Sequence, residues 1–419
     1  MSPRPVQMSV QLHPAAVAPA PAAGRFTVLL GCFLALLVSN GVVITLTFGT
    51  LLKPVSAELG LTRTQATGAL LVALAMTAAC APWFGRLVDR HGVRRVTAPA
   101  IAAFALATAA MGLVASSATT FILMYGLLGA ISAGHAPTAF AKVLIGWFQQ
   151  RRGVALGAAM SAVGVGGAIA PIFTRMLIDH FGWRGAYAGL GVLVAAIGLP
   201  ATLLCVRERD SRPGSAGDDA AAPQETRLFT IWRERDFFVM AAVFGLMGLA
   251  ATGVTSHLVP MLSDRGVSAA VSAGSASAVG LALIGGRLGA GLLLDWLGGR
   301  RVTLLVLLLM IAGCALLLLP VAVQPVFPAV LVGLGLGAEV DLLGFMLSAR
   351  FGLRGFGARY GVLFGVFTVC SGAGSLLMGM TFDATGAYGL GLGLLIGGLV
   401  LSMALTLMLP ALRSRIDRP

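Results

Sequence analysis

Three charged side chains lie deep within long apolar stretches of the sequence, and Arg287 is the first of them. It lies eight residues before Asp295, which on a helix is about 12 Å from the end of its apolar run. An arginine this deep must face a cavity or a partner. The positions four residues before and after it, Leu283 and Gly291, offer no acid. Because its planar guanidinium suits a carboxylate, Arg287 indicates either an organic-acid binding site or an ion pair with another helix.

Glu339 and Asp341 are the other two deep charges, and both lie in the apolar run 326–349. Two residues on a helix correspond to about 200° of rotation, so the two carboxyl groups cannot share one face. One of them can line a cavity and titrate while the other holds helices together. Carboxylates inside membrane helices commonly carry protons. Both a coupling role and a structural role therefore fit this pair.

Three weaker candidates lie in the first half of the chain. Asn40 can contact a substrate or bridge two helices. His135 can contact a substrate or be a hydrogen-bonded core histidine, and Lys142 can pair with an acid as part of a coupling system. If the run 120–147 is one helix, His135 and Lys142 share a face about 10 Å apart.

The composition requires that lipid surround the elements carrying these residues. Hydrophobic residues make up 58% of the 419 residues and charged residues only 11%, whereas soluble domains carry about 25% charged residues. The apolar runs are long and do not alternate with period two, which favours helices over a barrel. We expect an all-α membrane protein with spans at 25–53, 65–87, 96–115, 120–147, 153–178, 185–206, 237–262, 270–294, 302–321, 326–349, 360–382 and 390–409.

The distribution of charge predicts the topology. The net charge is +13, but most of the 29 Lys and Arg residues lie in the tails and in alternate loops, which is typical of a membrane protein and not of a nucleic-acid partner. With both termini cytoplasmic, the outer loops hold only Lys53, Arg63, Arg184 and Arg265. We expect a multi-pass protein of the cell (inner) membrane. The predicted parts are a disordered cytoplasmic tail (1–24), a six-helix bundle (25–206), a charged cytoplasmic linker (207–236), a second six-helix bundle (237–412) and a cytoplasmic tail (413–419).

The sequence contains no pattern typical of an enzyme or of a cofactor site. It has no Gly-x-x-x-x-Gly-Lys-Ser/Thr loop for nucleoside triphosphates, no metal-ligand cluster and no nucleophile–base set. The five cysteines lie singly inside apolar runs. We therefore expect no catalytic residues, no metal and no cofactor, and an ion or substrate gradient as the energy source.

A loop that occurs twice indicates an internal repeat. The pattern Gly-x-Leu-x-Asp-x-x-Gly-x-Arg-Arg begins at position 85 and again at position 291. Glycines let the chain reverse within a few residues, and the Asp can meet a helix N-terminus or an arginine. These loops are candidate conformational latches, with the residues Gly85, Asp89, Arg90, Gly92, Arg94, Gly291, Asp295, Gly298 and Arg300. A second echo pairs Asp179 and Gly182 with Asp383 and Gly386.

The repeated loop resembles the signature of the major facilitator superfamily, and twelve spans with a central linker fit that family. The resemblance covers the chain after the first tail. It implies two six-helix bundles that rock about a central cavity and expose it to each side of the membrane in turn.

A narrower resemblance is to the monocarboxylate transporter branch of that family. It rests on the segments 48–54 (FGTLLKP), 147–159 (WFQQRRGVALGAA) and 285–291 (GGRLGAG). In that branch the arginine of the eighth helix binds the substrate carboxylate, and the matching residue is Arg287. The resemblance thus implies a transporter of small organic anions.

The chain departs from the branch at its proton relay. Proton-coupled members carry a lysine where this chain has Leu46 and an aspartate where it has Leu283. The acidic, Trp-containing segment that opens the first helix is also missing. Antiport, uniport or a relay through Glu339 or Asp341 remain open, so the partner is a proton or a counter-substrate. The alternatives are an exporter of amphipathic drugs or metabolites, a sensor that binds without transport, and a membrane enzyme.

Overall fold

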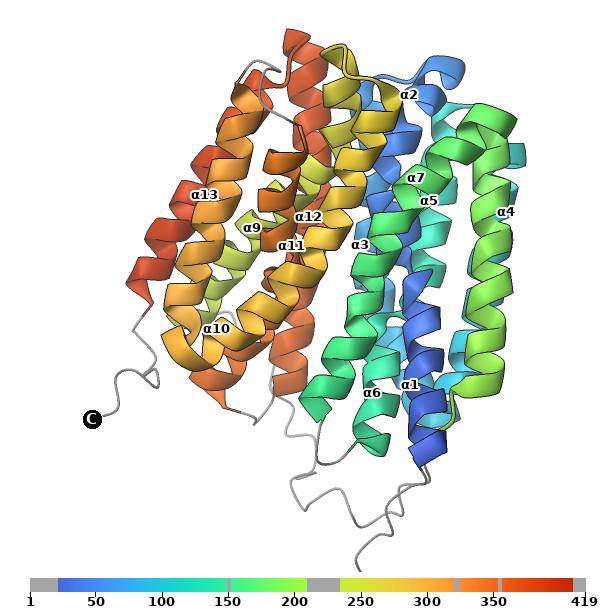
Figure 1. The fold of residues 1–419 in the computed structure, drawn as a ribbon, viewed down its shortest axis with the longest axis vertical. Helices are drawn as coiled ribbons and strands as arrows, with labels where there is room; N and C mark the ends of the chain where they lie inside the picture. The colour runs from blue at the N-terminus through green and yellow to red at the C-terminus, as the bar shows by residue number, and fades with distance from the viewer. Residues whose placement is uncertain (1–21, 149–151, 209–233, 320–324, 353–355, 410–419) are drawn as a thin grey trace, which may run out of the picture.

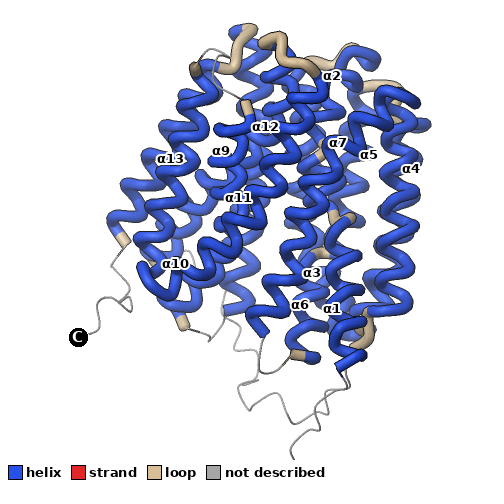
Figure 2. The backbone as a smooth tube through the Cα atoms, viewed as in Figure 1, coloured by secondary structure: helices blue, strands red, loops and turns tan. Residues whose placement is uncertain are grey.

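The computed structural model describes residues 22–148, 152–208, 234–319, 325–352 and 356–409, apart from the side chains of residues 22, 23, 152, 153 and 295, and these residues contain no strand (Figure 2). Figure 1 shows two groups of helices side by side, blue to green on the right and yellow to red on the left. The first group comprises α1 (Ala22–Leu37), a π-helical turn (Gly41–Leu46), α2 (Phe48–Leu59), α3 (Arg63–His91), α4 (Val93–Val114), α5 (Ala118–Ser132), a 3-10 turn (Ala133–His135), α6 (Pro137–Trp147), α7 (Arg152–Leu193) and two π-helical turns (Val194–Gly198, Ala201–Cys205). The second group comprises α9 (Arg235–Asp264), α10 (Ala269–Leu318), α11 (Val326–Phe351), α12 (Phe356–Thr385) and α13 (Gly389–Met408).

Eleven helical stretches in the described part of the chain are long and apolar enough to cross a membrane. One of them, Val154–Cys205, has 52 residues, more than twice what a bilayer requires. It breaks at Gly182, where φ is 68° and ψ is 178°. This stretch therefore forms two spans, which makes twelve and confirms the predicted all-helical membrane fold.

Each group of helices has its own apolar core. One buried cluster runs from Val28 to Val206 and the other from Phe237 to Leu409. The segments 1–21, 209–233 and 410–419 lie outside the described residues. We refer to the two groups as the N-terminal half and the C-terminal half.

The repeated glycines have the same backbone conformation in both halves. Gly92 has φ of 87° and ψ of 156°, and Gly298, its counterpart in the second loop, has φ of 75° and ψ of 159°. Gly182 and Gly386, which form the second echo, have φ of 68° and 69°. Side chains strongly disfavour this region of φ, so only glycine lets each pair of helices reverse here without strain. The sequence repeat is therefore a repeat of helix-connecting turns.

The span 120–147 is not one helix, which corrects the expected placement of two candidates. The α-helix ends at Ser132, a 3-10 turn follows, and Ala136 is extended with ψ of 152° before Pro137. Proline disfavours the helical conformation in the residue before it and has no N–H to donate. His135 and Lys142 lie on opposite sides of this break, so the expectation that they share a helical face was wrong.

Candidate functional site

Arg287 on α10 pairs with Asp341 on α11, and both belong to the C-terminal half. The Arg287 Nε donates to Asp341 Oδ2 at 3.0 Å. The Arg287 side chain is 13% exposed and that of Asp341 is 39% exposed, so the carboxylate is the more open partner. A charge this deep in a membrane helix needs such a partner. The sequence offered no acid four residues before or after the arginine on its own helix, and the fold supplies one from the neighbouring helix.

The same guanidinium also reaches the other half of the molecule. Arg287 Nη1 donates to the backbone carbonyl of Met160 on α7 at 3.0 Å. Within a helix, a backbone carbonyl normally accepts the N–H group four residues later. It is also uncharged, so it is a weaker acceptor for the guanidinium than a carboxylate would be. Arg287 therefore lies where the two halves meet, with one side of its fork on Asp341 and the other on a neutral oxygen.

Glu339 points away from this pair, as the 200° separation predicts. Its side chain is fully buried, and neither carboxyl oxygen has a hydrogen-bond partner among the described residues. Gly335, one turn earlier on α11, packs against Met310 in the second part of α10. Glu339 therefore faces the interior of the C-terminal half, and of the two carboxyl groups only Asp341 contacts Arg287.

The remaining candidates lie within the N-terminal half, each with a local partner. Asn40 Nδ2 donates to Ser132 Oγ at 3.2 Å and so bridges the first and fourth spans. His135 is 2% exposed and packs edge-on against Phe104, with ring centroids 4.8 Å apart. Their contacts do not bring them to Arg287, and their proposed contact with substrate stays a prediction.

The first latch loop is held by ionic contacts inside one half. Lys142 Nζ lies 2.8 Å from Asp89 Oδ1, so this lysine is a partner of the loop and not of the deep carboxylates. The backbone N–H of Val93 donates to Glu208 at 2.7 Å, which places a carboxylate over the N-terminus of α4 beside Gly92. The other latch residues lie on α3 (Gly85, Arg90), α4 (Arg94) and α10 (Gly291, Gly298, Arg300). The side chain of Asp295 lies outside the described residues.

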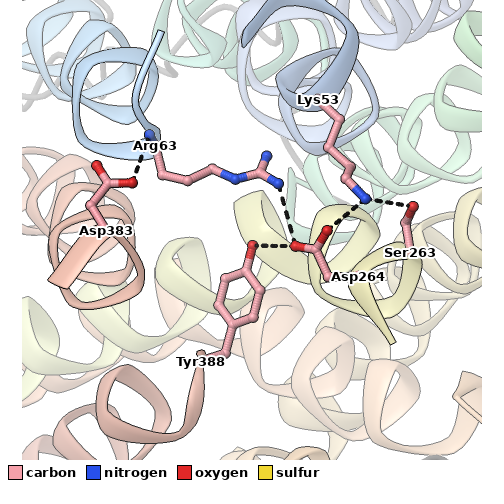
Figure 3. Close-up of polar contacts among 6 residues, drawn as sticks. All are labelled: Lys53, Arg63, Ser263, Asp264, Asp383 and Tyr388. Atoms are coloured by element: carbon pink, nitrogen blue, oxygen red, sulfur yellow. Dashed lines mark hydrogen bonds and ion pairs between the residues drawn. The ribbon is translucent and has the colours of Figure 1, made fainter. Parts of the chain in front are cut away.

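At the opposite end of the molecule, Asp264 at the end of α9 joins the two halves (Figure 3). Its carboxylate lies 2.6 Å from Lys53 Nζ and 3.3 Å from Arg63 Nη2, both of the N-terminal half. Tyr388 Oη donates to the same carboxylate at 3.4 Å. We call this the Asp264 end.

Asp383 on α12 makes a second link between the halves at the same end. Its two carboxylate oxygens accept the backbone N–H groups of Arg63 and Thr64, at 3.0 and 2.7 Å. These are the first residues of α3, where unpaired N–H groups and the helix dipole favour an anion. An acid of the C-terminal half therefore caps a helix of the N-terminal half. We call the other end of the molecule, which contains the first latch loop, the Asp89 end. The ion pairs described there, such as Arg350 with Asp236, stay within one half.

Glycines let the halves approach closely at three places. A Cβ on Gly49 of α2 would lie 2.8 Å from the Ser256 carbonyl oxygen, and a Cβ on Gly372 of α12 would lie 2.7 Å from Leu71 Cα. A Cβ on Gly280 of α10 would collide with the backbone of Gly167 on α7. The contact through Gly280 lies about two turns from Arg287, toward the Asp264 end.

The sequence did not point to the Asp264 network, although one signal for it exists. The loops at this end carry few charges, and those of the N-terminal half that take part are cations while those of the C-terminal half are anions. Opposite signs in segments some 200 residues apart are what an ionic contact between halves requires. No described group of three or more His, Cys, Asp or Glu side chains is placed to hold a metal ion.

Comparison with known proteins gives a family model and several relatives. The model described as Major Facilitator Superfamily matches residues 28–379. Monocarboxylate transporter 13 of Bos taurus is 28% identical over 298 residues, which are 69% of this chain and 68% of that protein. The tetracenomycin C resistance and export protein of Streptomyces glaucescens is 32% identical over 138 residues, which are 31% of this chain and 24% of that protein.

The fold also matches a solved structure. A crystal structure of a bacterial homologue of the human lysosomal transporter Spinster, in an inward-facing and unoccupied conformation, superposes with a TM-score of 0.73 at 18% identity. The match covers 92% of this chain and 97% of that one. The chain belongs to the Major Facilitator Superfamily, and its family and fold are those of membrane transporters and not of enzymes.

Proposed function

We propose that this protein is a secondary transporter of small organic anions, in particular monocarboxylates, that works by alternating access. The observation that carries the proposal is the Arg287 guanidinium, which lies where the halves meet and shares its donors between Asp341 and the neutral Met160 carbonyl. A substrate carboxylate is a stronger acceptor than that carbonyl and can take two parallel N–H donors of the fork. The similarity to a monocarboxylate transporter supports the same substrate class.

Asp341 is the coupling residue in this proposal. A substrate carboxylate on Arg287 brings a second negative charge next to Asp341, and two carboxylates that share one guanidinium favour protonation of one of them. A proton on Asp341 therefore accompanies the bound acid. When the acid leaves, Asp341 pairs with Arg287 again, as it does in this structure. Asp341 thus takes the place of the acid that the branch carries at the position of Leu283.

The proposed orientation follows from the distribution of positive charge. With both termini cytoplasmic, the Asp89 end lies on the cytoplasmic side of the membrane and the Asp264 end lies on the outer side. The ionic links at the Asp264 end then close the outer side, so the structure is a state closed to the outside. The rocking units are the bundles 25–206 and 237–412, and the linker 207–236 joins them.

Counterflow in proteoliposomes tests the substrate class. We expect labelled short-chain monocarboxylates to exchange, and their primary amides to exchange roughly 10- to 100-fold more slowly, because only the acids form charge-assisted hydrogen bonds with Arg287. Equal exchange of acids and amides would exclude an anion site.

Replacement of Asp341 tests coupling. We expect Asp341→Asn to retain exchange of labelled acid but to lose accumulation driven by an inward proton gradient, because the amide cannot take up the proton. Glu339→Gln is the matched control, since the Glu339 side chain faces the bundle interior and does not contact Arg287. If Asp341→Asn still accumulates the acid, or if only Glu339→Gln loses accumulation, Asp341 is not the coupling residue.

Replacement of Asp264 tests the closed end. Asp264→Asn removes the ionic part of the contacts with Lys53 and Arg63, which are partly exposed and contribute about 1 kcal/mol in total, roughly a fivefold shift toward opening. Spin labels at Ala57 and Ala270, in a background without the native cysteines, report the distance between the halves there. We expect a larger population of long distances.

Asp179→Asn is the matched control for Asp264→Asn. Asp179 pairs with Arg175 at the same end of the molecule but inside one half, so its loss should leave the distances unchanged. An unchanged distribution in Asp264→Asn would mean that these ion pairs do not hold the end closed.

Export of amphipathic drugs or metabolites is the second candidate function, and the similarity to a tetracenomycin export protein favours it. Export of neutral compounds does not need the Arg287 guanidinium. A resistance profile that survives Arg287→Gln, together with absent acid counterflow, would favour this alternative.

A further inference from the structure

Four aromatic side chains form a stacked ladder along α12. Ring centroids of Phe356 and Tyr360 lie 5.5 Å apart, those of Tyr360 and Phe364 5.9 Å apart, and those of Phe364 and Phe367 5.9 Å apart. The planes of the middle pair differ by only 6°. The spacing of four, four and three residues keeps all four rings on one face of the helix. The proposed function gives these four rings no role.

The direction of the ladder follows from what packs on either side of it. On one side, Val366 and Cys370 of α12 pack against Gly245 of α9, in the same half. On the other side, Gly372 and Gly379 pack against α3, in the opposite half.

The helical rotation of 100° per residue places Phe364 between these two packed sides. Phe364 is half-buried and is not among the residues that pack against the C-terminal core, whereas Phe356, Tyr360 and Phe367 are. The ring of Phe364 therefore points to the junction between the halves.

The ladder lies beside the Arg287–Asp341 pair. Tyr360 is within electrostatic range of both charged groups. A Cβ on Gly344, which follows Asp341 by three residues on α11, would lie 3.7 Å from the Tyr360 ring. A phenol, a guanidinium and an open phenyl ring are thus brought together by α10, α11 and α12.

We propose that this site selects monocarboxylates that carry an aryl ring, with the carboxylate on Arg287 and the ring stacked on Phe364 and Tyr360. The inference rests on the proposed function, because it uses the same arginine. A carboxylate alone would not contact the part of the Phe364 ring that stays exposed between its two neighbours in the ladder. A planar ring one or two carbon atoms from the carboxylate can extend the ladder by offset stacking, while its acid group stays on the guanidinium. Tyr360 Oη can add a hydrogen bond to the same carboxylate.

The test separates the ring from the acid. Counterflow in proteoliposomes is measured with phenylacetate, cyclohexylacetate and the primary amides of both. Cyclohexylacetate has a similar size and apolar area but no aromatic face. Stacking on one or two rings should favour phenylacetate over cyclohexylacetate by about five- to twentyfold in apparent affinity.

The two proposals fail differently in this test. Equal affinities for the two acids, with both amides inactive, would overturn the aryl inference and leave the anion transporter intact. Equal exchange of acids and amides would overturn the proposed function and the inference with it. A preference for phenylacetate and inactive amides would support both.

Variants of the ladder assign the preference to these rings. Phe364→Leu should reduce the preference for phenylacetate to about twofold or less while exchange of cyclohexylacetate continues. Phe327→Leu, which removes a largely exposed ring at the far end of α11, is the matched control and should keep the full preference. If Phe364→Leu keeps it as well, the ring of the substrate binds elsewhere. Tyr360→Phe retains the ring and loses the hydroxyl, and we expect it to keep the preference with weaker binding of both acids.

Discussion

Arg287→Gln should reduce counterflow of monocarboxylates by roughly 30-fold or more. Removing one partner of a hydrogen-bonded charge pair in a partly buried site commonly costs 2 kcal/mol or more, and the substrate is expected to be that partner. Arg287→Lys should also be impaired, because an ammonium keeps the charge and loses the planar fork. Initial rates of exchange of labelled acid measure both effects.

Misfolding is the competing explanation for such a loss, because Arg287→Gln leaves Asp341 without its cation. The double variant Arg287→Gln with Asp341→Asn removes both charges, and we expect it to be folded but inactive. Arg175→Gln is the matched control, since Arg175 pairs with Asp179 inside one half, and its activity should be near that of the parent. Acid exchange by the double variant at the rate of the parent would contradict the role of Arg287.

Gly280→Val should prevent the state described here, in which the Asp264 end is closed. The new side chain meets the backbone of Gly167 and Ala168, which cannot rotate away as a flexible side chain can. Overpacking of this kind costs about 1–3 kcal/mol, a 5- to 150-fold change in the population of the closed state. We expect longer distances between spin labels at Ala57 and Ala270, and slow exchange.

Gly274→Val is the control for Gly280→Val, because it lies on the same helix and a Cβ there meets nothing within 4 Å. Gly274→Val changes the helix propensity of α10 in the same way as Gly280→Val, but the new side chain does not contact α7. If both variants behave like the parent, the approach of α10 to α7 does not limit transport. If both are equally impaired, the effect comes from the helix itself.

The fold could be predicted from the sequence because lipid imposes simple rules on it. A long apolar run must be a helix, and the breaks at Gly182 and Gly298 were marked by loops that repeat. The span 120–147 was misread, because hydropathy does not register the effect of Pro137 on the preceding backbone. A proline in the middle of an apolar run was the available signal.

The site could be predicted only in part. The depth of Arg287 showed that it needs a partner, but that partner, Asp341, comes from another helix. The rotation of α11 decides whether Asp341 or Glu339 points toward Arg287, and their sequence spacing shows only that both cannot. The contacts of Asp264 with Lys53 and Arg63 depend on how two bundles meet, which no local pattern specifies.

A contact between the bound acid and Arg287 is the most direct test of the central claim. Solid-state NMR of the reconstituted protein, with 13C in the carboxyl group of phenylacetate and 15N in the arginines, measures dipolar coupling between the two. We predict a carbon–nitrogen distance of about 4 Å, as expected for hydrogen bonds between a guanidinium and a carboxylate. The coupling should disappear in Arg287→Lys. Bound phenylacetate without this coupling in the parent protein would contradict the account.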